Sequence, residues 1–418
     1  MQYLSKISGI GGLLDKTPES FIVNEITENG TILESGRAYT ADELGMKQDE
    51  SGKFAIFVLQ KYQWNTIQAL QTVGRRLGRG VKSVGYAGLK DRQSTSTQLA
   101  SLFGADSKKL AELKAKDITI NGAWQSSKGV EMGELLGNSF SVKIKDCNHT
   151  ERVDEIVKEL DGKFPNYFDG QRFGARLNNS RVGVKIMQGD IEGAAIEFLT
   201  ATSNERNEDA VNARKQLAQN MDFAEALGYF PGYLKLERTV LYYLSKEGRD
   251  FAKAMRSIPR GISIMFIHAV EALVFNCALE MMVKEENFKD AKLHCGLNFY
   301  GFPDATRVSE EAAALPILPL IGYETKEGHI SEYEEEVLDK LGIKPADFKI
   351  SSMPELSMRG AYRPALSTFK DFSSTEAEGS VNVRFSLPSG SYATVFIGEI
   401  IKGESLDMHM VEPRLKPA

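Results

Sequence analysis

Cysteine, histidine and tryptophan are scarce in this sequence. Its 418 residues include 3 cysteines, 5 histidines and 2 tryptophans. Three scattered cysteines are too few for a disulfide framework, and no cysteines or histidines have the short spacing of zinc ligands. His294 and Cys295 are adjacent, but no second pair lies near them in the sequence. The sequence therefore predicts neither a disulfide-stabilised fold nor a metal site.

Membrane-spanning and targeting segments are also missing. The best apolar run, "ISIMFIHAVEALVF", contains His268 and Glu271 and is shorter than the roughly 18 residues needed to cross a bilayer. At the N-terminus, Gly9, Gly11 and Gly12 interrupt what would have to be an apolar block after a basic region. Neither a Walker-type phosphate loop nor a dinucleotide fingerprint occurs. We expect a cytoplasmic protein with no membrane association, no cofactor of these classes and no obligate protein partner.

Excess positive charge is absent overall, since the net charge is -6. A negative total argues mildly against nucleic-acid binding, which usually leaves a basic footprint. The distribution is uneven, however: residues 71–92 contain six basic side chains and one acid, and residues 324–340 contain seven acids and two lysines. Two solvated faces are the plain interpretation. A basic cleft on an acidic protein is the alternative.

Hydrophobic patterns predict a sheet-based domain that a helical unit interrupts. A helix is expected at residues 64–78, with Asn65 or Thr66 as its N-cap, and another at 150–160 behind Thr150. Residues 179–357 have mostly helical patterns. The domains are therefore expected at 1–178 with 358–418, and at 179–357. Alternating or continuous apolar residues predict strands at 18–26, 53–62, 138–146 and 381–387.

The segment "GYAGLKDRQSTSTQ", residues 85–98, places one acid, Asp91, between Lys90 and Arg92. A solvated surface turn is the plain interpretation. In an extended backbone, however, neighbouring side chains point to opposite faces. Lys90 and Arg92 would then bind phosphates while the carboxylate faces a pocket, which suits nucleophilic or acid/base chemistry on a nucleotide.

Two other segments combine aromatic and polar side chains. "FPNYFDGQRFG", residues 164–174, has four aromatic rings with Asn166, Gln171 and Arg172; it suits either a core or base stacking. "RFSLPSGSYATVFIGEI", residues 384–400, contains Arg384 and Tyr392 around a Gly-Ser turn, and an ordinary hairpin is its plain interpretation.

Together these three segments resemble, in order and spacing, the signatures of the TruD family of tRNA pseudouridine synthases. "LLDKTPESFIVNEI" and "LLGNSF" match two further segments, and residues 237–278 are similar to the longer archaeal branch. The resemblance implies an α+β fold, in which a catalytic domain with a mixed, largely antiparallel sheet carries an inserted α/β (TRUD) domain whose family profile starts near residue 166. It also implies isomerisation of uridine, usually uridine 13 of tRNA, without a redox cofactor.

By motif position, the resemblance assigns the catalytic role to Asp91. It places Phe21, Asn138, Phe140 and Tyr392 around the uridine, with Phe140 stacking on the base. The expected partner is tRNA. The candidate RNA or phosphate contacts are Lys16, Lys90, Arg92, Arg172 and Arg384.

Three positions depart from the family pattern. Asp15 stands six residues before Phe21, where many members carry a lysine, and Lys16 is next to it. Asp169 follows "PNYF", and Ser96 takes a threonine position. The basic partner of Asp91 is therefore open. A catalytically vestigial tRNA-binding or folding module is the main alternative; an enzyme for free uridine nucleotides is a third, which the basic run disfavours.

Overall fold

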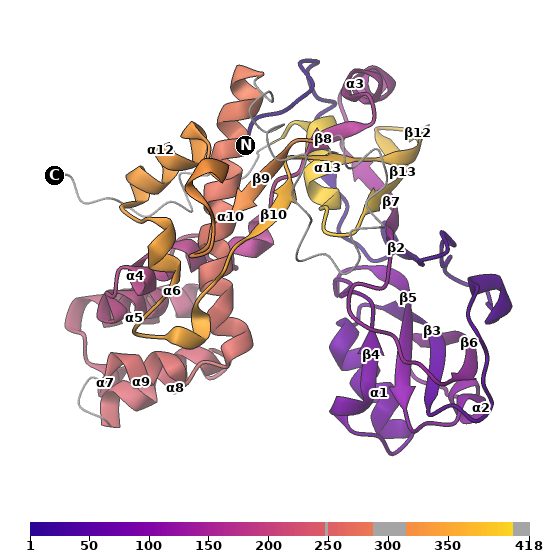
Figure 1. The fold of residues 1–418 in the computed structure, drawn as a ribbon, viewed down its shortest axis with the longest axis horizontal. Coiled ribbons are helices and arrows are strands. Elements are labelled where there is room, and N and C mark those ends of the chain that lie inside the picture. The colour runs from indigo at the N-terminus through magenta and orange to yellow at the C-terminus, as the bar shows by residue number, and fades with distance from the viewer. Residues whose placement is uncertain (247–249, 287–314, 404–418) are drawn as a thin grey trace. The chain divides into compact units, whose positions relative to one another are not determined.

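The computed structural model describes residues 1–246, 250–286 and 315–403, so His294 and Cys295 lie outside the described residues. The chain forms two compact units (Figure 1). One, the sheet unit, consists of residues 5–164 and 367–403. The other, the helical unit, includes residues 1–4 and 165–366. Both units are discontinuous in sequence.

A nine-stranded sheet is the centre of the sheet unit. Its main path has the order β12-β13-β7-β2-β5-β3-β6, with β1 beside β7 and β4 beside β5. Within this sheet, only β2 and β5 pair in parallel among the described strands, so the sheet is mixed and largely antiparallel, and the α+β expectation is confirmed. The strands are β1 (Leu13–Leu14), β2 (Phe21–Ile26), β3 (Phe54–Tyr62), β4 (Val84–Tyr86), β5 (Thr95–Phe103), β6 (Ile118–Ser126), β7 (Gly137–Lys145), β12 (Lys370–Ala377) and β13 (Ser380–Pro388).

The strand predictions are confirmed because side chains alternate between two faces along each strand. In β7, Phe140, Val142 and Ile144 are buried on one face, while Ser141 and Lys143 on the other are partly exposed. One row of paired residues crosses the sheet, and directly opposed residues share a face. That row is Phe385, Phe140, Val23, Ser96, Lys61 and Ile118, and we call its side of the sheet the lysine face.

Helices cover the lysine face at both ends of the sheet. Helix α1 (Thr66–Arg76) packs Leu70 and Val73 into the cluster that includes Phe57, whose strand position is on the lysine face. At the other end, Phe396 of α13 (Ala393–Ile401) lies 4.6 Å from Phe385, measured between ring centroids. The remaining helices of this unit are α2 (Ser107–Ala111), α3 (Val153–Leu160) and the 3-10 turns η1 (Asp42–Leu44), η2 (Val81–Ser83) and η3 (Thr150–Arg152).

Three local predictions have different outcomes. Asn65 is confirmed as the N-cap of α1, since its side chain accepts a hydrogen bond from the Ile67 N–H. Thr150 is not the cap of α3; it lies inside η3, and its hydroxyl donates to Glu376. The hairpin interpretation of residues 384–400 is wrong, because β13 is followed by helix α13. The apolar residues from Ala393 to Ile401 form a helix instead of a second strand, and this helix packs on the sheet.

The second unit is mainly helical, as the sequence predicted for its central region. Its helices are α4 (Asn179–Met187), α5 (Ile191–Thr200), α6 (Glu208–Asn220), α7 (Phe223–Tyr229), α8 (Lys235–Lys246), α9 (Phe251–Arg256), α10 (Arg260–Glu285) and α12 (Glu332–Leu341), with 3-10 turns η4 (Gly170–Phe173), η7 (Glu327–His329), η8 (Pro345–Phe348) and η9 (Pro354–Leu356). Strand β9 (Ile317–Leu320) pairs with β10 (Ala361–Pro364). Strand β8 (Lys163–Pro165) pairs with β11 (Leu366–Thr368), and both contain a point where the chain passes between units.

The division between units differs from the expected bounds of 179 and 357. Asn276 of α10 accepts a hydrogen bond from the Phe168 N–H and donates one to its carbonyl, each at 2.8 Å. These bonds tie residues before 179 to the helical unit. The pairing of β10 with β9 does the same for residues after 357. The structural unit therefore extends further in both directions than the composition suggested.

Helix α10 is long and apolar enough to span a membrane by length and composition. Its burial gives it another explanation, since 78% of the most apolar 18-residue window lies inside the protein. Figure 1 shows α10 running through the helical unit beside α4 and α12. The side chains of His268 and Glu271 contact each other at 2.7 Å. The helix has the environment of a core helix.

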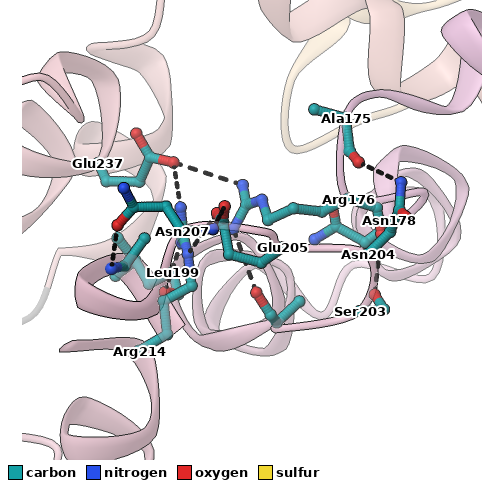
Figure 2. A network of polar contacts seen from close by, with 12 residues as sticks. Ala175, Arg176, Asn178, Leu199, Ser203, Asn204, Glu205, Asn207, Arg214 and Glu237 are labelled. Atoms are coloured by element: carbon teal, nitrogen blue, oxygen red, sulfur yellow. Dashed lines mark hydrogen bonds and ion pairs between the residues drawn. The ribbon is translucent and has the colours of Figure 1, made fainter. Parts of the chain in front are cut away.

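A buried ionic network also stabilises the helical unit (Figure 2). The Glu237 carboxylate lies 2.7 Å from the Arg214 guanidinium and 3.4 Å from that of Arg176, and Glu205 lies 3.7 Å from Arg214. Arg214 also donates to the Leu199 carbonyl. Burial lowers the pKa of Arg176 to about 10, and the Arg214 charge adds to this effect. The network joins α6 to α8 by charge pairing and to α5 by the hydrogen bond to Leu199.

Candidate active site

The loop from Ala87 to Ser94 carries Asp91 and is fixed at several backbone atoms. The Lys90 N–H donates to the Thr66 hydroxyl at the start of α1, at 2.9 Å. That hydroxyl lies 2.9 Å from the Gln98 amide oxygen, and the Gln98 amide nitrogen donates to the Gly88 carbonyl. Because Gln98 belongs to β5, the loop is bonded to both a helix and the sheet. Such support holds a reactive side chain in one place.

A buried ion pair fixes the loop to β2. The Lys90 ammonium lies 2.6 Å from Glu25 Oε2, and the two side chains are 3% and 1% exposed. The other carboxylate oxygen of Glu25 accepts a hydrogen bond from the Leu99 N–H at 2.9 Å. Lys90 is therefore not available to bind a phosphate, and that expectation is wrong. Its positive charge is paired with the Glu25 carboxylate inside the protein.

Asp91 has an exposed side chain and a firmly held backbone. Its carbonyl accepts hydrogen bonds from the Lys61 ammonium and the Ser94 hydroxyl, both at 2.8 Å. Lys61 is fully buried, and this burial lowers its pKa to about 8, although the negative charge of Asp91 acts in the opposite direction. A carboxylate accessible to a ligand thus lies next to a cation that is not.

Aromatic rings lie on the lysine face of β2, β7 and β13. Phe140 stacks on Phe385, with ring centroids 5.3 Å apart and planes 23° apart. Phe21 meets Phe140 edge-on, with a centroid distance of 6.4 Å. Phe21 shares this face because it is opposite Val142, two residues from Phe140. The neighbouring aromatic rings hold Phe140 in a defined orientation.

Two buried polar atoms on the lysine face have no hydrogen-bond partner within the described residues. They are Oδ1 of Asn138 and Oγ of Ser96. Asn138 is directly opposite Glu25, the partner of Lys90, and Ser96 is directly opposite Lys61. Buried polar groups are nearly always bonded, so such atoms near an exposed carboxylate are candidates to bind a ligand.

A family model and individual relatives match the chain along most of its length. The family model of "tRNA pseudouridine synthase D (TruD)" matches residues 1–295 and 297–400. The chain belongs to the TruD family. This is a family of isomerases, and the match extends over both the sheet unit and the helical unit.

Individual relatives match along nearly their full length. A protein of Methanococcoides burtonii, named probable tRNA pseudouridine synthase D, is 31% identical over 97% of this chain and 96% of its own. A protein of the same name from Thermococcus sibiricus is 31% identical over 96% of this chain and 97% of its own. The crystal structure of a TruD protein from Methanosarcina mazei superposes with a TM-score of 0.75 at 29% identity, and it covers 97% of this chain and 96% of that one.

The TruD signature residues predicted from the sequence lie in three parts of the sheet unit: the lysine face, the Asp91 loop and the start of α13. Phe21, Asn138 and Phe140 share the lysine face, and the Asp91 loop is bonded to that face through Lys61 and Glu25. Tyr392 occupies the N-cap position of α13, whose Phe396 packs on the same face.

The remaining candidate RNA contacts are dispersed. Lys16 and Arg92 are exposed, and the Arg92 Nε donates to the Gln63 carbonyl. Arg384 is exposed. It is the neighbour of Phe385 in β13, so its side chain points away from the lysine face and from the Asp91 loop. Arg172 belongs to the helical unit, where its guanidinium lies over the Phe168 ring at 4.9 Å. Lys16 and Arg92 therefore stay as candidate contacts, because both side chains are exposed and neither is paired with an acid within the described residues.

The aromatic cluster of residues 164–174 forms part of the core. Its four rings are buried, and the faces of Phe168 contact the guanidinium groups of Arg172 and Arg363. Base stacking needs accessible ring faces, so the core interpretation holds and the base-stacking interpretation does not. The four rings belong to Phe164, Tyr167, Phe168 and Phe173.

The basic run of residues 71–92 is largely a surface feature of the sheet unit. Five of its six basic side chains are exposed, and Lys90 is the exception. Such a cluster is the electrostatic footprint of a nucleic-acid site. The exposed five are Arg75, Arg76, Arg79, Lys82 and Arg92.

Asp15, at the position where a lysine was expected, has a local structural role. Its carboxylate accepts hydrogen bonds from the Thr17 N–H and the Ser20 hydroxyl, at 3.2 and 3.0 Å. The Thr17 backbone bond is the largest contribution that lowers the pKa of Asp15. Asp15 thus closes the turn that leads into β2.

Sequence reasoning missed Glu25, Lys61, Thr66 and Gln98, which fix the loop. One signal was present: Lys61 follows Phe57 and Leu59 at alternating positions, and both are buried on the same face. A lysine in register with buried residues is rarely tolerated without a partner.

Proposed function

We propose that this chain converts a specific uridine of tRNA to pseudouridine, with Asp91 as the catalytic residue. The observation that carries the proposal is an exposed carboxylate on a loop fixed at Gly88, Lys90 and Asp91, above a sheet face with Phe21, Asn138 and Phe140. Membership of the TruD family supports the substrate class. We propose uridine 13 as the target and the cytoplasm as the place of action, following the family resemblance.

The reaction is an isomerisation that needs no oxidant or reductant. The N1–C1′ bond breaks, the uracil turns, and C5 bonds to C1′; C5 loses a proton, and N1 gains one. Asp91 would attack C1′ or C6, or accept the C2′ proton on a glycal route. All three roles require an ionised carboxylate. The exposure of the Asp91 side chain is consistent with contact to the nucleotide.

The lysine face also carries side chains suited to recognise the uracil base. The uridine must leave the RNA stack, which costs roughly a few kcal/mol. Stacking on Phe140 would recover part of that cost; because this ring is 7% exposed and Phe385 covers one side, the opposite face of Phe140 must be uncovered when the nucleotide binds. The Asn138 carbonyl oxygen, which has no partner within the described residues, suits the uracil N3–H as a donor. Phe21 and Tyr392 would border the base.

The test is to incubate the protein with an unmodified tRNA transcript and map pseudouridine by carbodiimide-dependent primer stops. The expected result is one new stop at uridine 13 that disappears with Asp91→Asn. No stop with the wild-type protein would refute the proposal. Modification by Asp91→Asn would refute the role of Asp91. If that variant lacks turnover but still supports the protein's biological role, the tRNA-binding module becomes the better account.

A further inference from the structure

We propose that Lys61 is the cationic partner of Asp91: a positioning residue that holds the Asp91 loop through a buried hydrogen bond to its backbone. The inference rests on the proposed function and answers a question that the sequence left open. The Lys61 ammonium is 2.8 Å from the Asp91 carbonyl oxygen. Lys61 is fully buried, so it would act on the nucleotide only through Asp91.

Hydrogen bonding alone does not account for a lysine at this position. The Asp91 carbonyl already accepts a bond from the Ser94 hydroxyl at 2.8 Å. Placing an ammonium in a buried site carries a large desolvation cost. A charge retained at that cost is best explained by a nearby charge of opposite sign, and the Asp91 carboxylate raises the pKa of Lys61 against the larger effect of burial.

Within the described part of the chain, none of the other basic candidates has a hydrogen bond or ion pair with Asp91. Lys90 is paired with Glu25 at 2.6 Å, so that pair contributes little net charge to its surroundings. Arg92 is exposed and donates to the Gln63 carbonyl. Lys16 is exposed in the turn before β2.

The neighbours of Lys61 on each packed element can be named. On β5 and β6 its paired residues are Ser96 and Ile118, which are uncharged. The loop contributes Asp91 and Lys90, and the Lys90 charge lowers the pKa of Lys61 further. Asp91 is therefore the negative group that acts on this ammonium, apart from the Glu25 already paired with Lys90.

The experiment compares Lys61→Met, Lys61→Arg and a control, Lys143→Met, in the full-length protein with a tRNA transcript. Lys143 lies in the same sheet but on the opposite face, so its loss leaves the Asp91 surroundings unchanged. For Lys61→Met we expect kcat to fall by about tenfold or more while KM for tRNA stays constant. A fall in kcat with an unchanged KM separates loss of carboxylate positioning from loss of RNA binding.

Lys61→Arg keeps a charged donor for the Asp91 carbonyl, so a folded Lys61→Arg protein should retain most of the wild-type kcat. If Lys61→Arg does not fold, Lys61→Met still decides the matter. A wild-type kcat in folded Lys61→Met would overturn the inference, as would a change confined to KM. Failure of the proposed function is distinguishable, because then the wild-type protein makes no pseudouridine at all.

Discussion

The buried pair between Glu25 and Lys90 allows a quantitative prediction about the Asp91 loop. Replacing Glu25 with Gln removes the negative charge but keeps a carbonyl oxygen that can accept from the Leu99 N–H. The change in unfolding free energy therefore reports the loss of the ion pair and not the loss of the hydrogen bond from Leu99. It leaves the Lys90 ammonium, which is 3% exposed, without its counter-charge.

The magnitude follows from that burial. Breaking a buried ion pair by removing one partner costs about 3–5 kcal/mol, because a desolvated charge is left uncompensated. An exposed pair would cost at most about 1 kcal/mol. The double variant Glu25→Gln/Lys90→Met removes both charges, and buried pairs replaced in this way often show little net loss. We expect the double variant to be more stable than Glu25→Gln alone.

Tryptophan fluorescence during urea unfolding measures the stability of the sheet unit, to which Glu25 and Lys90 belong. Both tryptophans, Trp64 and Trp124, belong to the sheet unit, so their emission reports unfolding of that unit and not of the helical one. Stability is obtained from the linear dependence on urea. A Glu25→Gln cost below about 1 kcal/mol, or a double variant as unstable as the sum of both single variants, would refute the proposed burial and coupling.

Four further predictions follow from the site and its surroundings. Asp91→Asn, at an exposed position, should change stability by no more than about 0.5 kcal/mol in urea titrations while pseudouridine stops disappear. The pKa of Lys61 is lowered from 10.5 to about 8 in the folded protein, so wild-type stability should rise as pH increases between these values. Below pH 8, Lys61→Met should accordingly be more stable than wild type by up to about 3 kcal/mol in urea, and above pH 10.5 this gain should be absent. Glu237→Gln should destabilise the helical unit by about 3–5 kcal/mol, detected by circular dichroism, without moving the tryptophan transition. Arg75→Glu and Arg79→Glu should weaken tRNA binding with unchanged kcat, and each should reduce the salt slope of binding by about 1 or more; wild-type affinity in both variants would exclude this surface.

Hydrophobic patterns were enough to predict the main strands: β7 and β13 alternate, whereas β3 is a continuous apolar run because both of its faces are buried. The "NSFSVKIKD" and "VNVRFSL" patterns correspond to β7 and β13, which pair with Phe140 opposite Phe385. The pattern was less informative after residue 392, where a short apolar run suits either a buried strand or a helix. There the packing of Phe396 on the sheet decided the outcome.

Composition could not separate the two interpretations of the aromatic cluster at residues 164–174. The same side chains serve as a core or as a stacking platform, and only burial distinguishes these uses. The bonds from Asn276, more than a hundred residues away in the chain, draw Phe168 into the helical unit. Sequence reasoning has no access to a partner at that separation.

The direction of Lys90 shows most clearly where sequence reasoning stopped. Alternation predicts opposite directions for neighbouring side chains only when the backbone is extended, and the Ala87–Ser94 loop follows no regular strand. Its conformation is set by Thr66 and Gln98, and a carboxylate from β2 takes the Lys90 charge. The position of Asp91 in the chain was therefore readable from its motif, but its electrostatic environment arises from the pairing of β2, β3 and β5. A lysine thirty residues upstream thereby becomes the neighbour of Asp91.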